Sequence, residues 1–230
     1  VVVAGIGCSG NLVHLLEGDQ PYGIHGIHGR SLPIALGVKM AQPTLNVVVV
    51  AGDGDFLSIG GEHIAPQAAR NLNICAVIMD NGVYGLTKGQ ASPPSLAGFQ
   101  DNIEEDLDPI MLGLSIPGST FLARGYSGQP AQLLQLTLAA LRHTAAGHGM
   151  SYLEVLSPCV TYNDMYREWR TNVFDIDSED SYDPGNRAGA FGRMMELRQQ
   201  GRLPLGLIYL GERPALDSLA LNPEFVAPAR

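Results

Sequence analysis

The chain has 230 residues, of which 45% are hydrophobic and only 16% are charged, so it can bury a sizeable core and is not of the disordered class. Its 23 acidic and 14 basic residues give a formal net charge of −9, which argues against nucleic acid or an anionic membrane surface as a partner. No apolar run approaches the roughly 18 residues that span a bilayer. Three cysteines favour a reducing compartment over a disulfide framework, and we therefore expect a cytoplasmic protein.

Short β-branched runs that end at glycine or polar residues predict a mainly parallel sheet. In chain order, the predicted strands cover residues 1–5, 46–51, 74–79, 120–123, 152–156 and 205–209. The predicted helices cover residues 34–40, 60–70, 130–143 and 188–200. We expect the third of these helices to present Leu134, Leu138 and Leu141 on one face. Strands that alternate with helices predict an α/β fold with helices on both faces of the sheet, in which ligands bind at the carboxyl ends of the strands.

The composition changes near residue 171. Residues 171–187 (TNVFDIDSEDSYDPGNR) are acidic and poor in apolar side chains. They resemble a calcium-binding loop only superficially, because its glycine and glutamate positions are taken by Asp180 and Asn186, and a solvated connector is the favoured interpretation. We therefore predict an α/β domain over residues 1–170, followed by a connector, helix and tail over residues 171–230 that complete the same subunit.

Residues 47–90 carry the strongest chemical signal. A predicted strand runs into Gly52-Asp53-Gly54, and the next predicted strand ends at Asp80-Asn81. The interval suits one strand–helix–strand crossover of about 30 residues, so the Asp53 and Asn81 side chains should emerge close together at one edge of the sheet. Such oxygen ligands suit Mg²⁺, which takes its other ligands from substrate phosphates, and a following helix N-terminus favours a diphosphate. The alternative is a glycine-rich turn with a capping aspartate; the position of Asn81 favours the metal site.

Several motifs together resemble one enzyme family. They are GIGCSG (5–10), HGR (28–30), GDGD…IGGEH (52–63), DNGVYGLTKGQ (80–90), SPC..YN (157–163) and GRLPLGLIYLGERP (201–214). The GDG…N pattern resembles thiamine-diphosphate-binding domains, and the whole set resembles the β subunit of 2-oxoacid:ferredoxin oxidoreductases over nearly the entire chain. The string YGLTKGQ is most similar to the members that act on 2-oxoglutarate.

The resemblance implies the diphosphate-binding half of a thiamine diphosphate fold. It implies that Mg²⁺ is bound by the side chains of Asp53 and Asn81 and by the carbonyl of Val83. Residues 59–62 would begin the helix beneath the diphosphate. The resemblance implies further residues that shape the diphosphate pocket, support the bent cofactor or lie near its substrate end. They are Gly52, Gly54, Asp55, Leu86, Thr87 and Arg30.

Two residues are candidates for catalytic roles. His28 lies in the HGR motif and is implied to touch the diphosphate or the substrate, and Lys88 would pair with a substrate carboxylate. The alternative for Lys88 is a solvated loop residue, and the alternative for Arg30 is a structural ion pair. His63 fits either a helix surface or a pocket wall, and we expect the histidines at positions 14, 143 and 148 at the surface or at helix ends.

Two cysteines follow predicted strands at the ligand edge of the sheet. By the resemblance, Cys8 and Cys159 supply two of the four thiolates of a [4Fe–4S] cluster, and a CxxC motif near the N-terminus supplies the other two. This sequence has no CxxC and does not begin with Met. We expect that it is the remainder of a longer polypeptide that carried the motif; the alternative is a lost cluster. The chain as given is not expected to hold a complete cluster, and Cys75 is expected in the core.

The implied reaction is the CoA-dependent oxidative decarboxylation of a 2-oxoacid, with 2-oxoglutarate favoured over pyruvate and electrons passed to ferredoxin. Thiamine diphosphate would carry the chemistry. Because this chain supplies only the diphosphate half of the site, an α (or α/γ) partner would supply the carboxylate that activates the cofactor. Glu62 is the local alternative, although it belongs to the diphosphate helix. The competing interpretations are a non-redox thiamine-dependent decarboxylase or synthase fragment and a non-catalytic assembly subunit.

Overall fold

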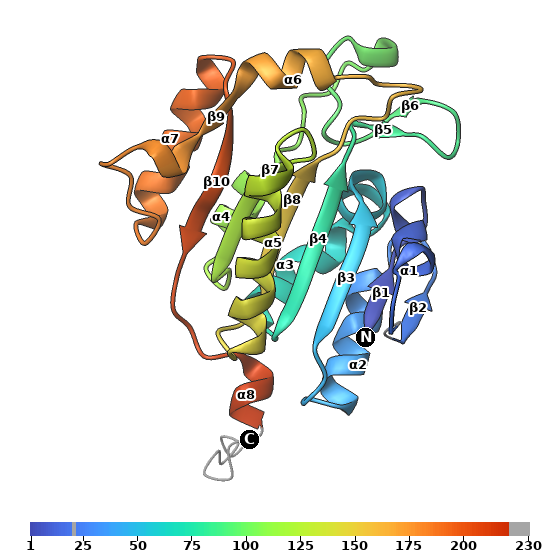
Figure 1. Cartoon of the computed structure of the whole chain (residues 1–230), viewed down its shortest axis with the longest axis vertical. Coiled ribbons are helices and arrows are strands. Elements are labelled where there is room, and N and C mark those ends of the chain that lie inside the picture. Colours follow the sequence, from blue (N-terminus) through green and yellow to red (C-terminus); the bar gives the residue numbers. More distant parts are fainter. Residues whose placement is uncertain (20–21, 221–230) are drawn as a thin grey trace.

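The computed structural model describes residues 1–19 and 22–220, and within them an eight-stranded sheet carries helices on both faces (Figure 1). The strands of this sheet, in spatial order, are β2 (Gly23–His25), β1 (Val2–Ala4), β3 (Val47–Gly52), β4 (Ile74–Asp80), β8 (Ser151–Leu156), β7 (Phe121–Tyr126), β10 (Leu203–Leu210) and β9 (Val173–Asp175). Neighbouring strands are parallel except β10, which runs antiparallel to β7. A separate antiparallel hairpin consists of β5 (Val83–Tyr84) and β6 (Gln90–Ala91).

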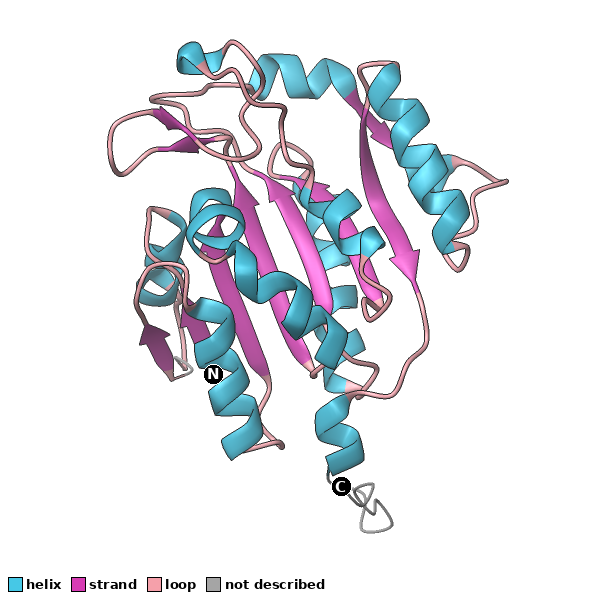
Figure 2. Cartoon of the chain, turned by 180° about the vertical axis from the view of Figure 1, so that it is seen from behind, coloured by secondary structure: helices cyan, strands magenta, loops and turns pink. Residues whose placement is uncertain are grey.

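The helices divide between the two faces of the sheet. They are α1 (Leu12–Leu15), α2 (Ser31–Ala41), α3 (Gly61–Arg70), α4 (Pro109–Ser115), α5 (Pro130–Ala145), α6 (Tyr166–Asn172), α7 (Arg187–Gln199) and α8 (Leu216–Ala220). Buried side chains of α2, α3, α4 and α7 form one core with the sheet, whereas α1 and α5 pack on the opposite face (Figures 1 and 2). The α/β prediction is therefore confirmed. Across the described residues, no helix has the length and apolar character needed to cross a bilayer.

The predicted central strands are confirmed within one or two residues of their observed ends. The exception is β7, which extends to Tyr126, three residues beyond its predicted end, with Arg124 buried in an ion pair. The short edge strands β2 and β9 were not predicted, since they lack the β-branched run of a buried strand. β9 pairs with the eight-residue strand β10. β2 pairs with the equally short β1, which in turn pairs with the six-residue strand β3, so both edge strands belong to a multi-stranded sheet.

The predicted face of α5 is wrong in one respect. Leu134 is 57% exposed, whereas Leu136 and Ala140 are buried against β7 and β8, with Leu133 packed beside them. These three residues follow the i, i+3, i+7 spacing of a single helix face. The leucine-rich composition of this helix offers two overlapping apolar stripes, and the one that contains Leu136 faces the sheet.

Residues 171–187 are more structured than the predicted solvated connector. β9 pairs in parallel with the start of β10, and Ile176, which follows β9, is fully buried. The following residues 178–187 are mostly exposed, as expected. Strands β9 and β10 thus extend the same sheet as the N-terminal strands, and residues 221–230 of the predicted tail lie outside the described residues.

The order in which successive strands are added to the sheet changes direction between β1 and β3. The connection after β1 passes through α1 to β2 at one edge, whereas the connection after β3 passes through α3 to β4 on the other side. Helices α1 and α3 lie on opposite faces of the sheet. In open α/β sheets, ligands bind beyond the carboxyl ends of the strands at such a switch point. The topology therefore predicts a ligand site among the loops after β1, β3 and β4.

Candidate active site

Two neighbouring parallel strands bring the predicted metal ligands together. β3 and β4 pair in register up to Gly52 and Met79. Asp53 follows the end of β3, and Asn81 follows Asp80, the last residue of β4, so the two chain segments leave the sheet side by side. The backbone N–H of Asn81 donates to Asp53 Oδ1 at 3.4 Å. The proximity expected from the crossover length is confirmed.

The turn after β4 is held by its own side chains. Asn81 Oδ1 accepts from the Val83 N–H at 3.0 Å, and Asp80 Oδ1 accepts from the Gly82 N–H at 2.9 Å. Gly82 has a φ of 61°, a conformation that glycine adopts without strain. The Val83 carbonyl accepts from the Gly85 N–H at 3.0 Å. An amide oxygen has two lone pairs, so Asn81 Oδ1 can accept a second partner.

Buried negative charge at this edge favours a cation. Asp53 is only 2% exposed and Asp80 only 4% exposed. Burial raises the pKa of Asp53 to about 6, and burial together with the charge of Asp53 raises the pKa of Asp80 to about 7. A divalent cation would stabilise the ionised forms that burial disfavours. Residues 1–19 and 22–220 contain no cluster of three or more His, Cys, Asp or Glu side chains arranged for a metal.

Asp55 joins three loops at this site. Its side chain is completely buried, and Oδ1 accepts from the backbone N–H groups of Ile6 (3.0 Å) and Gly29 (2.8 Å) and from Nδ1 of His28. A β-carbon on Gly5 would lie 2.2 Å from Asp55 Oδ2, so only glycine fits there. Asp55 thus fixes the loops after β1 and β2 against the start of the segment that follows β3.

His28 is oriented by this carboxylate. Because a carboxylate only accepts hydrogen bonds, the contact places a proton on Nδ1 of His28. In the neutral ring, Nε2 is then the basic nitrogen, and the side chain is 38% exposed. This is the arrangement in which a carboxylate sets the tautomer of a histidine that accepts a proton at its other nitrogen.

Arg30 makes the structural ion pair that was one of its two predicted alternatives. Its Nη1 lies 3.2 Å from Glu62 Oε1 and donates to the carbonyls of Gly29 (3.0 Å) and Ile59 (2.9 Å). Glu62 also lies 3.4 Å from Nε2 of His63 at the start of α3. The ion pair therefore links the HGR loop to the N-terminal turn of α3.

The candidate substrate-end residues lie on the hairpin of β5 and β6, which projects from the carboxyl edge of the sheet (Figure 1). Leu86 is 63% exposed, and Thr87 Oγ1 donates to Gln90 Oε1 at 2.6 Å. Lys88 has a φ of 79° and an exposed side chain, with no hydrogen bond or ion pair from its ammonium group to any described residue. The structure therefore does not join Lys88 directly to His28 or Asp53.

Cys8 and Cys159 meet across this hairpin. A β-carbon placed on Gly85 would lie 3.6 Å from Cys159 Sγ and 3.8 Å from Cys8 Sγ. The two thiols come from the loops after β1 and β8, which two other strands separate. Cys8 is exposed and Cys159 is partly exposed, whereas Cys75 is buried in β4, as predicted. Burial raises the pKa of Cys75 to about 11.

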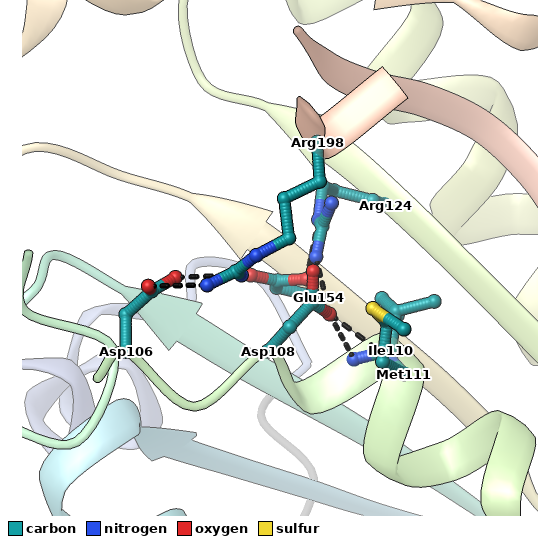
Figure 3. Close-up of polar contacts among 7 residues, drawn as sticks. All are labelled: Asp106, Asp108, Ile110, Met111, Arg124, Glu154 and Arg198. Carbon is teal, nitrogen blue, oxygen red and sulfur yellow. Dashed lines mark hydrogen bonds and ion pairs between the residues drawn. The ribbon is translucent and has the colours of Figure 1, made fainter. Parts of the chain in front are cut away.

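A buried ion network joins β7, β8 and the start of α4 (Figure 3). Arg124 of β7 donates to Glu154 of β8 at 2.5 Å and to Asp108, the N-cap of α4, at 2.7 Å. Asp108 also accepts from the N–H groups of Ile110 and Met111 at 2.9 and 3.0 Å. Although burial opposes it, the charge of Arg124 holds the pKa of Asp108 below its usual range.

Glu154 connects this network to the residue that precedes Asn81. Burial raises its pKa well above the usual range despite the Arg124 charge, and the nearby carboxylates of Asp108 and Asp80 add to the shift. Asp80 and Glu154 lie on adjacent paired strands near the carboxyl ends of β4 and β8. The sequence pattern did not identify this network, because its members come from four separate segments.

The sequence pattern also missed Ser92, which donates from Oγ to Asp53 Oδ2, and Ser95, which donates to the Gly82 carbonyl at 2.6 Å. His143 lies in the last turn of α5, one of its two predicted alternatives, and it is buried there with Nε2 3.0 Å from Thr120 Oγ1. Serines in a proline-rich loop and a histidine near a helix end carry no signal of burial in the sequence.

Comparisons with known proteins agree with the fold. Residues 5–155 match the family of the C-terminal TPP binding domain of thiamine pyrophosphate enzymes, and residues 159–221 match the C-terminal family of the pyruvate ferredoxin oxidoreductase β subunits. The chain is also similar to a solved structure, the 2-oxoglutarate:ferredoxin oxidoreductase from Magnetococcus marinus with 2-oxoglutarate, coenzyme A and succinyl-CoA bound. The two share 32% sequence identity and a TM-score of 0.83, and the match covers 95% of this chain and 74% of that chain. The fold and site thus define a thiamine-diphosphate-binding domain.

Curated relatives identify the family more narrowly. The β subunit of 2-oxoacid:ferredoxin oxidoreductase 2 from Aeropyrum pernix is 40% identical over 225 residues, which cover 90% of this chain and 70% of that protein. The 2-oxoglutarate synthase subunit KorB of Archaeoglobus fulgidus is 38% identical over 168 residues, or 70% of this chain and 60% of that protein. The chain belongs to the family of β subunits of 2-oxoacid:ferredoxin oxidoreductases, a class of oxidoreductase enzymes.

Proposed function

We propose that this chain binds thiamine diphosphate through Mg²⁺ and forms the β subunit of a CoA-dependent 2-oxoacid:ferredoxin oxidoreductase. The observation that carries the proposal is the meeting of Asp53 and Asn81 at the ends of two adjacent parallel strands. 2-Oxoglutarate is the favoured substrate and pyruvate the alternative, because the string at residues 84–90 is most similar to the 2-oxoglutarate enzymes and the KorB relative carries that name.

The ligands proposed for Mg²⁺ are the Asp53 carboxylate, the Asn81 amide oxygen and the Val83 carbonyl. The buried carboxylate of Asp53 and the neutral amide and carbonyl oxygens of Asn81 and Val83 are hard oxygen ligands that fit such a cation. Gly52 and Gly54 let the backbone approach the diphosphate; a β-carbon on Gly54 would lie 2.2 Å from the Tyr84 ring.

The other cofactor residues act around this centre. Asp55 carries a negative charge, and its Oδ1 already accepts from several N–H donors, so we assign it to shaping the diphosphate pocket rather than to contact with the phosphates. Arg30 holds the HGR loop beside the start of α3 and adds positive charge to the pocket. Leu86, exposed on the hairpin, offers an apolar support for the bent cofactor, and Thr87 follows it at the substrate end.

Bound thiamine diphosphate would supply the nucleophilic carbon and the electron sink needed to cleave a 2-oxoacid. In this chain, His28 would accept or return a proton at Nε2, because Asp55 holds Nδ1. Lys88 would bind the substrate carboxylate, since its ammonium group has no partner among the described residues and its side chain is exposed on the hairpin.

Electron transfer requires groups beyond this chain. We propose that Cys8 and Cys159 supply two thiolates to a [4Fe–4S] cluster and that two further ligands come from a polypeptide segment outside residues 1–230. Their approach to one point beside Gly85 supports this assignment. The proposed partners are an α (or α/γ) subunit that supplies the carboxylate for cofactor activation, and ferredoxin as the electron acceptor. We propose a cytoplasmic location and a division of the chain near residue 170.

The test is reconstitution of the β subunit, with the two further cluster thiolates supplied, together with the α (or α/γ) partner. The assembled enzyme should reduce ferredoxin only when 2-oxoacid and CoA are both present, and the Asp53→Ala variant should lose this activity. Release of CO₂ and aldehyde without ferredoxin reduction would instead indicate a non-redox decarboxylase. Turnover by this chain alone would contradict the divided site, and failure of the chain to bind thiamine diphosphate would indicate an assembly role.

A further inference from the structure

Two buried serines lie directly against the proposed metal site. Ser92 is 5% exposed and Ser95 is 2% exposed. They follow β6 and form one closed turn, in which the Ser95 N–H donates to the Ser92 carbonyl at 2.8 Å. Neither serine is a proposed ligand of the metal or of the cofactor.

Ser92 fixes one oxygen of the metal-binding carboxylate. Its hydroxyl donates to Asp53 Oδ2, while Asp53 Oδ1 faces the backbone N–H of Asn81. A carboxylate held at one oxygen cannot rotate freely about its terminal bond. The other oxygen is therefore kept on the side of the site from which Asn81 approaches.

Ser95 holds the second half of the same site. Its Oγ accepts from the Ser92 N–H at 2.7 Å and donates to the Gly82 carbonyl at 2.6 Å. Gly82 separates Asn81 from Val83, the other two proposed ligands. One turn thus contacts both the residue that follows β3 and the loop that follows β4.

We propose that Ser92 and Ser95 are positioning residues that hold the three proposed ligands at one mutual geometry before the metal binds. The inference rests on the proposed function of Asp53, Asn81 and Val83. Partners that orient metal ligands through hydrogen bonds commonly change metal affinity about 10- to 100-fold when removed. The hydroxyl of Ser92, which contacts a ligand directly, should have the larger effect of the two.

The test compares Ser92→Ala, Ser95→Ala and Ser92→Thr, which keeps a hydroxyl, with Ser119→Ala as the matched control. Ser119 is also a buried serine, 6% exposed, and its Oγ donates to the Gly113 carbonyl at 2.8 Å away from the site. The full chain in its assembled enzyme is titrated with Mn²⁺ in the presence of thiamine diphosphate. Free Mn²⁺ is counted by electron paramagnetic resonance, and thermal unfolding is recorded on the same samples.

We expect Ser92→Ala to raise the Mn²⁺ dissociation constant about 10- to 100-fold, Ser95→Ala to raise it less, and Ser92→Thr to recover most of the loss. Ser119→Ala should lower the unfolding temperature comparably while leaving Mn²⁺ affinity nearly unchanged. Equal Mn²⁺ affinity in wild type and Ser92→Ala, or an equal loss in Ser119→Ala, would overturn the inference. Absence of Mn²⁺ binding by the wild type would refute the proposed function itself, and the positioning role with it.

Discussion

The buried ion pair of Arg124 allows a direct test of how this sheet edge is stabilised. Replacing Arg124 with Met removes the guanidinium that Glu154 and Asp108 share while keeping an unbranched side chain. Arg124 is 3% exposed, and Asp108 and Glu154 are also largely buried. Arg198 provides the matched control, because it pairs with Asp106 through two hydrogen bonds in the same region but is 38% exposed (Figure 3).

The two substitutions should differ severalfold in cost. Removing one partner of a buried ion pair leaves an uncompensated buried charge and lowers the free energy of unfolding by about 3–5 kcal/mol. Removing one partner of an exposed pair costs about 0–1 kcal/mol. We therefore expect Arg124→Met to be destabilised by several kcal/mol and Arg198→Met by no more than about 1 kcal/mol. The double variant Arg124→Met/Glu154→Gln should recover part of the loss, because it removes one of the unpaired carboxylates.

Urea unfolding measures these differences. The only tryptophan, Trp169, packs edge-on against Tyr126 at the end of β7 and reports on this region by fluorescence. The penalty of Arg124→Met should shrink as the pH falls, since Asp108 loses the cation that holds its pKa low and is then protonated more readily. Equal destabilisation by the two arginine substitutions, or no recovery in the double variant, would refute the reasoning.

Three further predictions concern other parts of the chain. Burial lowers the pKa of His143 to about 4, so the stabilising contribution of this histidine should be lost as the pH falls from about 6.5 toward 4. We expect the loss to be about 1–2 kcal/mol after allowance for solvent screening. Urea unfolding compared at about pH 7.5 and pH 5 should show this loss in the wild type but not in His143→Gln. In iron-free native protein, iodoacetamide should label Cys8 and Cys159 but not Cys75, and mass spectrometry that finds Cys75 labelled at a similar rate would count against its burial. Asp55→Ala leaves backbone donors of two loops without an acceptor and should lower the free energy of unfolding by about 3 kcal/mol; unchanged stability would show that these donors find other partners.

The central strands and the proximity of Asp53 to Asn81 could be predicted because both depend on short-range patterns. β-branched runs that end at glycine define buried strands, and the length of one crossover requires Asp53 and Asn81 to emerge on adjacent strands. The same reasoning predicted the α/β class and the burial of Cys75. These features require no knowledge of how distant segments pack.

Features that depend on distant segments could not be predicted. The approach of Cys8 to Cys159 depends on loops from strands that are not neighbours in the sheet, and only the family resemblance suggested it. The pairing of Arg124 with Asp108 and Glu154 depends on how α4 packs on the sheet. The choice between the two leucine stripes of α5 likewise depends on the shape of the surface against which it packs.

The most direct test of the central claim is a calorimetric titration of thiamine diphosphate into the purified protein, with Mg²⁺ or with EDTA. Wild type and the control Asp183→Ala, which alters an aspartate far from the strand ends of β3 and β4 in the sequence, should bind the cofactor saturably only when Mg²⁺ is present. Asp53→Ala should show no Mg²⁺-dependent binding. Equal binding by Asp53→Ala and wild type, or wild-type binding that is the same in EDTA, would contradict the assignment of the two strand ends to a shared cation.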